Sequence, residues 1–205
     1  NAWGNPYACP IAGAKLVFPG SKMGDGETLA ALINEEKVTL SAGVPTVWLG
    51  LLTHLKKSGQ RIDSLERIIV GGAACPLSIM EDLDSYGVST RVGWGMTEMS
   101  PLGSANASDS ERNKYSDEDY ARLRLKAGRP IFGVEMKIVD DEGKSLPWDG
   151  EAFGSLLVRG PWVCSSYFKL EDSDAHAREA GWFETGDVAT IDADGYLAIT
   201  DRTKD

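Results

Sequence analysis

The order of apolar segments along the chain predicts an α/β protein, in which a mostly parallel sheet with covering helices is followed by a smaller β-rich, barrel-like subdomain. Over residues 14–94, short apolar runs typical of strands alternate with stretches whose apolar residues recur every three or four positions. Beyond residue 128, short strand-like segments are separated by turns such as Asp149-Gly150. Alternating strands and helices favour a parallel sheet, whereas short strands in succession favour an antiparallel one.

The α/β part is expected to begin with a strand and then to alternate helices with strands. Leu29, Leu32 and Ile33 have the spacing of one buried helix face. Pro45 suits the first turn of the next helix, and Gly59 suits its end. We expect strands at 14–18, 38–42, 67–70 and 89–92, and helices at 27–36, 45–58 and 76–87.

The β-rich part is expected to begin near Ala127. Residues 134–138 alternate strictly between apolar and polar, as a half-buried strand does. Before this boundary, the polar stretch 106–126 favours a surface helix or excursion. We therefore expect subdomains at 1–127 and 128–200 and a separate charged segment at 201–205, with further strands at 155–159, 188–191 and 196–200.

The composition excludes several functional classes. The chain has 205 residues, 42% of them hydrophobic and 25% charged, which is ordinary for a globular protein. A net charge of −10 argues against a nucleic-acid partner, because no excess of Lys and Arg is available to neutralise phosphates. No apolar run is long enough to span a bilayer, and no signal-peptide pattern stands at the start. We therefore expect a cytoplasmic location.

The cysteines and histidines argue against two further kinds of site. Cys9, Cys75 and Cys164 are odd in number and lack C-x-x-C spacing, so neither a disulfide framework nor a zinc site is expected. His54 and His176 do not lie beside a Ser or Cys motif. Catalysis by a His-activated nucleophile is therefore not expected.

The segment from Gly93 to Pro101 contains the strongest candidate for a ligand-binding loop. It follows an extended run, and in an open α/β sheet ligands lie just outside the carboxyl ends of the strands. Trp94 offers a flat face for a purine, Thr97 a hydroxyl for a phosphoryl oxygen, and Glu98 a carboxylate suited to Mg²⁺. An ordinary Gly-rich turn with a packed Trp and a solvated Glu explains these nine residues equally well.

The segment from Gly71 to Pro76 follows an apolar strand and precedes a predicted helix. Its small residues would let a nucleotide or an acyl chain approach the backbone closely. A dinucleotide site is disfavoured, because the G-x-G-x-x-G spacing is absent and no acidic residue ends the next strand.

Together, several motifs resemble those of the adenylate-forming enzymes, a superfamily of acyl-CoA synthetases, luciferases and peptide-synthetase adenylation domains. The resemblance covers the whole chain, and the Met-Thr-Glu-Met-Ser-Pro version is most similar to medium- and long-chain fatty-acid–CoA ligases. One departure is Ser166, where the family usually has a glycine. The motifs that carry the resemblance lie at residues 1–7, 42–46, 71–76, 93–101, 154–161, 182–187 and 201–205.

The resemblance implies a role for individual residues. Glu98 would hold Mg²⁺ and, with Thr97, act on the phosphoryl group. Trp3 would be the aromatic gate of an acyl tunnel, and Lys204 the pivot of a hinge. The nucleotide would contact Gly72, Ala73, Ala74, Trp94, Gly95, Met96, Thr97, Asp187 (ribose hydroxyls) and Arg202 (ribose and phosphate), and the acid would contact Trp3, Gly72 and Met99.

The implied reaction uses ATP, Mg²⁺ and coenzyme A to convert a fatty or related carboxylic acid into its CoA thioester. The family has a phosphate loop before, and a small domain with a catalytic lysine after, the region resembled here, so the isolated 205 residues are expected to be inactive. Aryl, amino or short sulfur-containing acids are alternative substrates, and a non-catalytic nucleotide- or acyl-binding module is the alternative class. We expect small-molecule partners, and the sequence is compatible with both a monomer and a homodimer.

Overall fold

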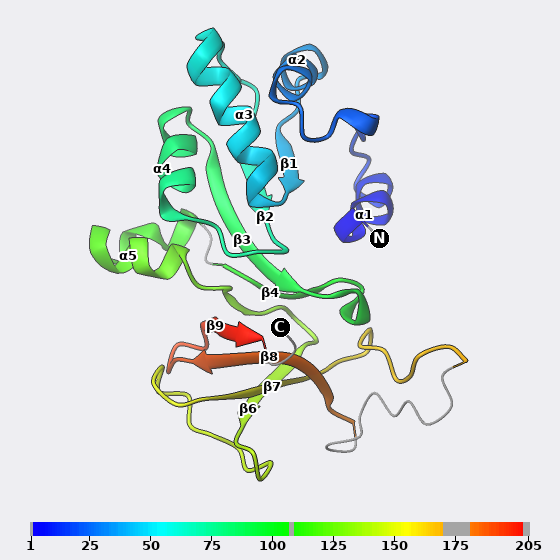
Figure 1. Cartoon of the computed structure of the whole chain (residues 1–205), viewed down its shortest axis with the longest axis vertical. Coiled ribbons are helices and arrows are strands. Elements are labelled where there is room, and N and C mark those ends of the chain that lie inside the picture. Colours follow the sequence, from blue (N-terminus) through cyan, green and yellow to red (C-terminus); the bar gives the residue numbers. More distant parts are fainter. Residues whose placement is uncertain (1, 107–108, 170–180, 203–205) are drawn as a thin grey trace. The chain divides into compact units, whose positions relative to one another are not determined.

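The computed structural model describes residues 2–106, 109–169 and 181–202 (Figure 1). Two compact units share these residues. Ala2–Gly93 and Ala107–Leu125 form one, here called the helical unit. Trp94–Asn106 and Lys126–Asp205 form the other, here called the β-rich unit.

The helical unit contains a parallel sheet made of β1 (Leu40–Gly43), β2 (Arg67–Val70) and β3 (Ser89–Gly95). The last two residues of β3 belong to the β-rich unit. The strands are joined by α3 (Pro45–Ser58) and α4 (Leu77–Ser85). Apolar residues of these helices, of α2 (Gly26–Glu36) and of the strands form one buried core. The predicted α/β class is confirmed.

The predicted strand at 14–18 is wrong. Residues 14–19 have no regular secondary structure and lie between α1 (Asn5–Ile11) and the short 3-10 helix Gly20–Lys22. A strand in a sheet buries at least one of its faces, but Phe18 is 67% exposed. Leu16 and Val17 are only half-buried, so the apolar run does not form the buried face of a strand. Another 3-10 turn, Ala2–Gly4, precedes α1.

Local signals explain where α2 and α3 begin and end. Asp25 caps α2, since its carboxylate accepts the N–H of Thr28 at 3.0 Å. α3 begins at Pro45 and ends before Gly59, whose φ of 70° closes the last turn. The two helices pack closely at Gly26, where a Cβ would lie only 2.3 Å from the carbonyl oxygen of Gly50.

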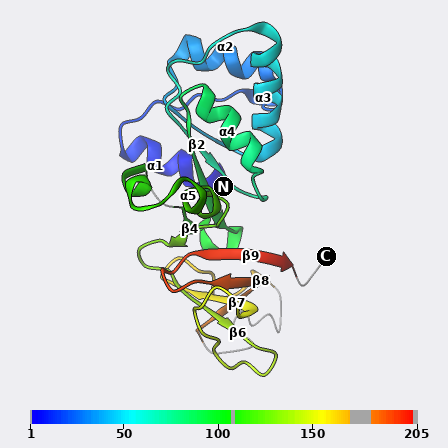
Figure 2. The same ribbon diagram turned by 90° about the vertical axis from the view of Figure 1, so that its left-hand side faces the viewer.

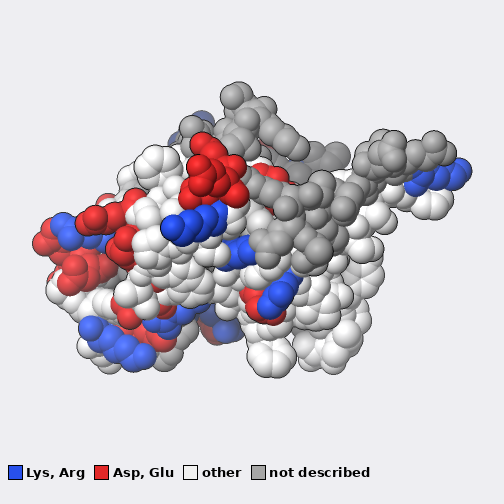
Figure 3. Space-filling view, turned by 90° about the horizontal axis from the view of Figure 1, so that it is seen from below, with Lys and Arg blue, Asp and Glu red and all other residues white. Residues whose placement is uncertain are grey.

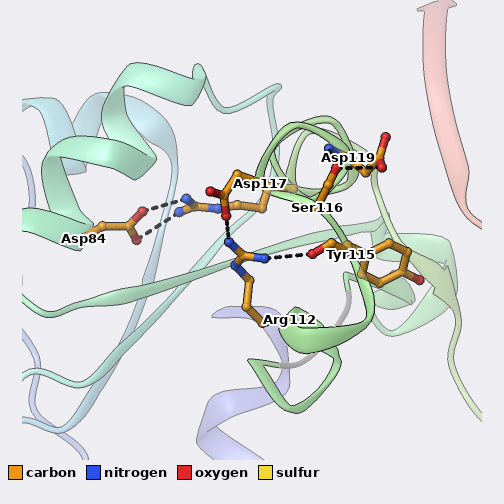
Figure 4. Close-up of polar contacts among 7 residues, drawn as sticks. Asp84, Arg112, Tyr115, Ser116, Asp117 and Asp119 are labelled. Atoms are coloured by element: carbon orange, nitrogen blue, oxygen red, sulfur yellow. Dashed lines mark hydrogen bonds and ion pairs between the residues drawn. The ribbon is translucent and has the colours of Figure 1, made fainter.

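The polar stretch before residue 126 contains the surface helix predicted from the sequence. A 3-10 segment, Asp109–Lys114, precedes α5 (Asp117–Arg124), which Ser116 caps through the N–H of Asp119 at 3.1 Å. Figure 4 shows this region beside Asp84 of α4. The guanidinium of Arg124 donates to both carboxylate oxygens of Asp84, at 2.6 and 3.0 Å, and thereby ties α5 to α4.

The β-rich unit is built from antiparallel strands (Figure 2). Four of them form a curled sheet in chain order, around a core that includes Ile138, Leu156 and Leu197. The predicted β-rich, barrel-like part is thus confirmed. The bounds are β4 (Leu102–Ala105) and β5 (Arg129–Pro130), which pair with each other, and β6 (Glu135–Val139), β7 (Phe153–Arg159), β8 (Phe183–Ile191) and β9 (Leu197–Arg202).

Charged side chains of both signs are interspersed on the face shown in Figure 3. The exposed ion pairs of the described residues include Arg159 with Glu135, at 2.6 Å. Among the residues that the structure describes, no helix combines the length and the apolarity needed to cross a membrane.

Candidate functional site

Trp94 and Asp187, which are 93 residues apart in sequence, meet within the β-rich unit. The indole Nε1–H of Trp94 donates a hydrogen bond of 2.9 Å to Oδ2 of Asp187. Asp187 is only 6% exposed, whereas Trp94 is half-buried against the apolar core of the unit. A buried carboxylate is costly unless it is hydrogen-bonded, and the indole supplies one such bond.

A β-bulge brings Asp187 to this position. Between the pairs Ser155↔Val188 and Leu157↔Glu184, β8 contains two residues more than β7. Gly186 lies in this bulge with φ of 79°, a left-handed conformation that favours glycine. The N–H of Asp187 donates to Oγ1 of Thr185 at 3.1 Å, and this hydroxyl donates to the carbonyl of Leu156 at 3.0 Å. The Thr-Gly-Asp sequence therefore fixes the backbone of Asp187.

Two glycines, one at the end of β3 and one in β4, shape the surroundings of Trp94. A Cβ on Gly95 would lie 1.9 Å from the carbonyl oxygen of Pro101, so the backbone can make this turn only with glycine. A Cβ on Gly103 would lie 2.6 Å from both Cζ3 of Trp94 and Cε of Met99. The six-membered ring of Trp94 thus rests directly against the backbone of β4.

Glu98 lies in the 3-10 turn Thr97–Met99 and is held through both its backbone and its side chain. The N–H of Cys164 donates to the carbonyl of Glu98 at 2.8 Å, and the hydroxyl of Tyr167 donates to Oε1 of Glu98 at 3.0 Å. Desolvation, together with the hydrogen bond to the Glu98 carboxylate and its charge, raises the pKa of Tyr167 to about 12. Desolvation and the same charge also raise the pKa of the Cys164 thiol.

The surroundings of Glu98 fit a Mg²⁺ ion that is shared with a phosphate ligand. Oε2 receives no hydrogen bond from the described residues, and the side chain is partly exposed. No group of three or more His, Cys, Asp or Glu among the described residues could hold an ion by itself. Mg²⁺ is usually bound by one or two carboxylates together with substrate phosphates and water, so a single carboxylate is a suitable donor set.

In the helical unit, the structure brings Trp3 close to the segment that follows β2. A Cβ on Gly71 would lie 3.7 Å from Cζ2 and Cη2 of the Trp3 indole. Trp3 is half-buried and has φ of 53°, a left-handed conformation that is rare for a bulky residue. Gly72, with φ of 78°, and the two alanines that follow it are exposed.

The remaining predicted residues differ in their surroundings. Thr97 is exposed and Met96 is half-buried against the core. Met99 is fully buried in that core, and its contact with the acid stays a prediction. The backbone of Arg202 belongs to β9, while its side chain and the whole of Lys204 lie outside the described residues.

The sequence did not indicate three residues that support the site. Tyr167 and Cys164 contact Glu98 from more than 60 positions away, and Gly103 carries the Trp94 ring. None of these contacts follows a local sequence pattern. The glycine at 103 is the one detectable signal, because glycine inside a strand often marks a close approach.

A comparison with protein families identifies one match. The sequence model of a family described as AMP-binding enzyme matches residues 1–168. The match covers the whole of the helical unit and the first part of the β-rich unit.

Several curated proteins are similar over the whole chain. A 3-methylmercaptopropionyl-CoA ligase of Ruegeria lacuscaerulensis is 52% identical over 206 aligned residues, which are 100% of this chain and 38% of that protein. A medium-chain-fatty-acid–CoA ligase of Ectopseudomonas oleovorans is 48% identical, with 100% and 37% covered. A long-chain-fatty-acid–CoA ligase of Thermus thermophilus is 41% identical, with 100% and 38% covered. The chain therefore spans well under half the length of these relatives.

Solved structures agree in fold. An anthranilate CoA ligase in complex with anthranoyl-AMP superposes with a TM-score of 0.77 at 26% identity, covering 94% of this chain and 35% of that one. The O-succinylbenzoate coenzyme A synthetase of Bacillus subtilis, in complex with ATP and magnesium ion, has a TM-score of 0.71 at 28% identity, with 88% and 35% covered.

Proposed function

Because the chain belongs to the family of AMP-binding enzymes, we propose that the protein carrying it activates a carboxylic acid as an acyl-adenylate and then forms a CoA thioester. In the first step a carboxylate oxygen attacks the α-phosphorus of ATP, the α–β phosphoanhydride bond breaks, and pyrophosphate leaves. In the second step the thiol sulfur of coenzyme A attacks the acyl carbonyl, its proton is lost, and AMP leaves.

The observation that carries this proposal is the paired placement of Trp94 and Asp187, each within a motif of the family. In the proposed complex, the carboxylate of Asp187 accepts hydrogen bonds from the ribose hydroxyls, which are charge-assisted and therefore strong. The Trp94 ring offers its apolar face to the adenine. These contacts hold the nucleotide so that its α-phosphorus meets the acid in a favourable geometry.

Glu98 and Thr97 are the residues proposed to act at the phosphates. A bound Mg²⁺ would neutralise the charge that develops on the phosphoryl oxygens. Glu98 would hold this ion through its carboxylate, and the exposed hydroxyl of Thr97 would donate to a phosphoryl oxygen. The contact with Tyr167 keeps the Glu98 side chain in one orientation before any ligand arrives.

Formation of a CoA thioester by the full-length gene product tests the activity. The assay contains ATP, Mg²⁺, coenzyme A and one acid, and its products are separated by chromatography. The expected result is one AMP for each acyl-CoA formed. ADP in place of AMP, or no thioester with any acid of the series below, would refute the proposal.

We propose that the acid is a linear aliphatic or thioether acid. Relatives named for 3-methylmercaptopropionate and for medium- and long-chain fatty acids lie between 41% and 52% identity, which supports a linear chain. 3-Methylmercaptopropionate and pentanoate have nearly the same shape, with sulfur in place of one methylene. A comparison of these two acids with octanoate and an aryl acid therefore separates a preference for sulfur from a preference for length.

Trp3 is the residue proposed to control access of the acid, because its indole lies against Gly71 at the start of the small-residue segment. If it acts as a gate, Trp3→Ala should broaden the chain-length profile, by an amount limited to about 1–3 kcal/mol per methylene. If it only packs, the substitution should cost roughly 3–5 kcal/mol of stability and leave the profile unchanged. Melting temperature and rates over the acid series distinguish the two.

A further inference from the structure

The edge of the Trp94 indole, rather than its face, contacts Asp187. Asp187 is almost fully buried as a residue, and the indole N–H of Trp94 donates to one of its carboxylate oxygens at 2.9 Å. A hydrogen bond to an ionised group is roughly twice as strong as one between neutral groups. The contact therefore restrains the rotation of the carboxylate as well as offsetting its burial.

Both partners of this hydrogen bond are fixed independently of it. The Trp94 ring rests against the backbone at Gly103, where even a Cβ would lie 2.6 Å from the ring. On the other side, the bulge with Gly186 and the hydrogen bond to Thr185 hold the backbone of Asp187. The direction from which the N–H approaches the carboxylate is thus set by the fold.

We infer that Trp94 is a positioning residue for ribose recognition, whose indole N–H fixes the orientation in which the Asp187 carboxylate meets the two ribose hydroxyls. This inference rests on the proposed function, because it requires that Asp187 bind ribose. It adds a role that stacking on adenine does not include. A phenylalanine at position 94 retains an aromatic face but has no N–H to donate.

The test compares two nucleotides that differ only in the ribose hydroxyls. Calorimetry on the full-length gene product gives the affinities for AMP and for 2′,3′-dideoxyadenosine monophosphate. In the wild type, AMP should bind roughly tenfold or more tightly, as hydrogen bonds to a charged group would give. In Trp94→Phe, AMP should bind at most about threefold more tightly than the dideoxy nucleotide. The affinity for the dideoxy nucleotide itself should stay nearly constant.

Three further variants complete the experiment. Trp148→Phe removes an indole from a 42% exposed site in the same unit and should leave both affinities unchanged. Asp187→Asn should also lose the preference for AMP. Adding Trp94→Phe to Asp187→Asn should then have little further effect on the ratio, because both changes remove the same interaction.

The outcomes separate this inference from the proposed function. An equal loss of affinity for both nucleotides in Trp94→Phe would mean that the ring only stacks or packs, and would overturn the inference. A wild-type preference for AMP that persists in Trp94→Phe would overturn it as well. If the wild type itself shows no preference, the assignment of Asp187 to ribose fails, and the inference fails with it. Retained binding of the dideoxy nucleotide verifies that the variant is folded.

Discussion

Gly103→Ala should destabilise the β-rich unit by overpacking the site that holds Trp94. The new methyl carbon would lie 2.6 Å from both Cζ3 of Trp94 and Cε of Met99, and 2.9 Å from Cε3 of Trp94. Met99 is fully buried, and the Trp94 ring is also tied to Asp187, so neither side chain can move away freely. Overpacking of this kind costs about 1–3 kcal/mol.

The assay is thermal unfolding followed by near-ultraviolet circular dichroism, which is sensitive to the environment of Trp94. For a chain of this size, each kcal/mol corresponds to roughly 2–4 °C in melting temperature, so we expect a decrease of roughly 2–12 °C. Gly24→Ala is the matched control, because a Cβ there meets nothing within 4 Å. It should have no effect or stabilise slightly, since alanine restricts the unfolded chain.

The same substitution should also weaken AMP binding, because displacing the Trp94 ring moves its N–H away from Asp187. A melting temperature within 1 °C of the Gly24→Ala control would refute the reasoning, because an unstrained alanine at position 103 would mean that the ring does not rest on this backbone. Unchanged AMP affinity together with lower stability would mean that the packing of Trp94 against Gly103 is not needed for its proposed role in nucleotide binding.

Three other predictions follow from separate contacts. Arg124→Ala should lower the free energy of unfolding by about 1–3 kcal/mol, because the bidentate pair with Asp84 links two helices and the Arg side chain is only 12% exposed. Urea unfolding measures this change, and an effect below about 0.5 kcal/mol would contradict the prediction. Backbone N–H donors hold the pKa of Asp149 below its ordinary value of 3.8, so the ionised carboxylate should stabilise the fold above that pH. This stabilisation should be lost as the pH falls through the folded-state pKa. The urea midpoint between pH 6 and 3 should therefore decline less in Asp149→Asn than in the wild type, and equal declines would argue against the prediction. Tyr167→Phe should weaken Mn²⁺ binding in the presence of ATP by about tenfold, measured by electron paramagnetic resonance, because Glu98 loses its orienting hydrogen bond; unchanged affinity would exclude that role.

Much of the fold could be predicted because its signals are local. Pro45 and Gly59 mark the ends of α3, and apolar periodicity placed Ile33, which is 4% exposed, on a buried helix face. The strand prediction at 14–18 was wrong because a short apolar run does not show whether its side chains are buried. The Phe18 side chain is largely exposed. Burial depends on tertiary contacts that no window of a few residues contains.

The candidate site was predictable in its residue types but not in its contacts. The Thr-Gly-Asp motif pointed to Asp187, yet the bulge that turns it toward Trp94 depends on the register between β7 and β8. Similarly, Glu98 was predicted, whereas its hydrogen bond to Tyr167 connects segments 69 residues apart. Met99 was assigned to the acid through the resemblance alone, and no local pattern indicated that its side chain is buried in the core.

Exchange of labelled pyrophosphate into ATP, measured without coenzyme A, tests the central claim most directly. In the full-length gene product, exchange should require both Mg²⁺ and a carboxylic acid, because only reversible formation of an acyl-adenylate returns pyrophosphate to ATP. Glu98→Gln should slow it by roughly a hundredfold or more, since a metal contact at the phosphates is worth several kcal/mol. Exchange that proceeds without any acid, or none with any acid tested while AMP still binds, would contradict the account.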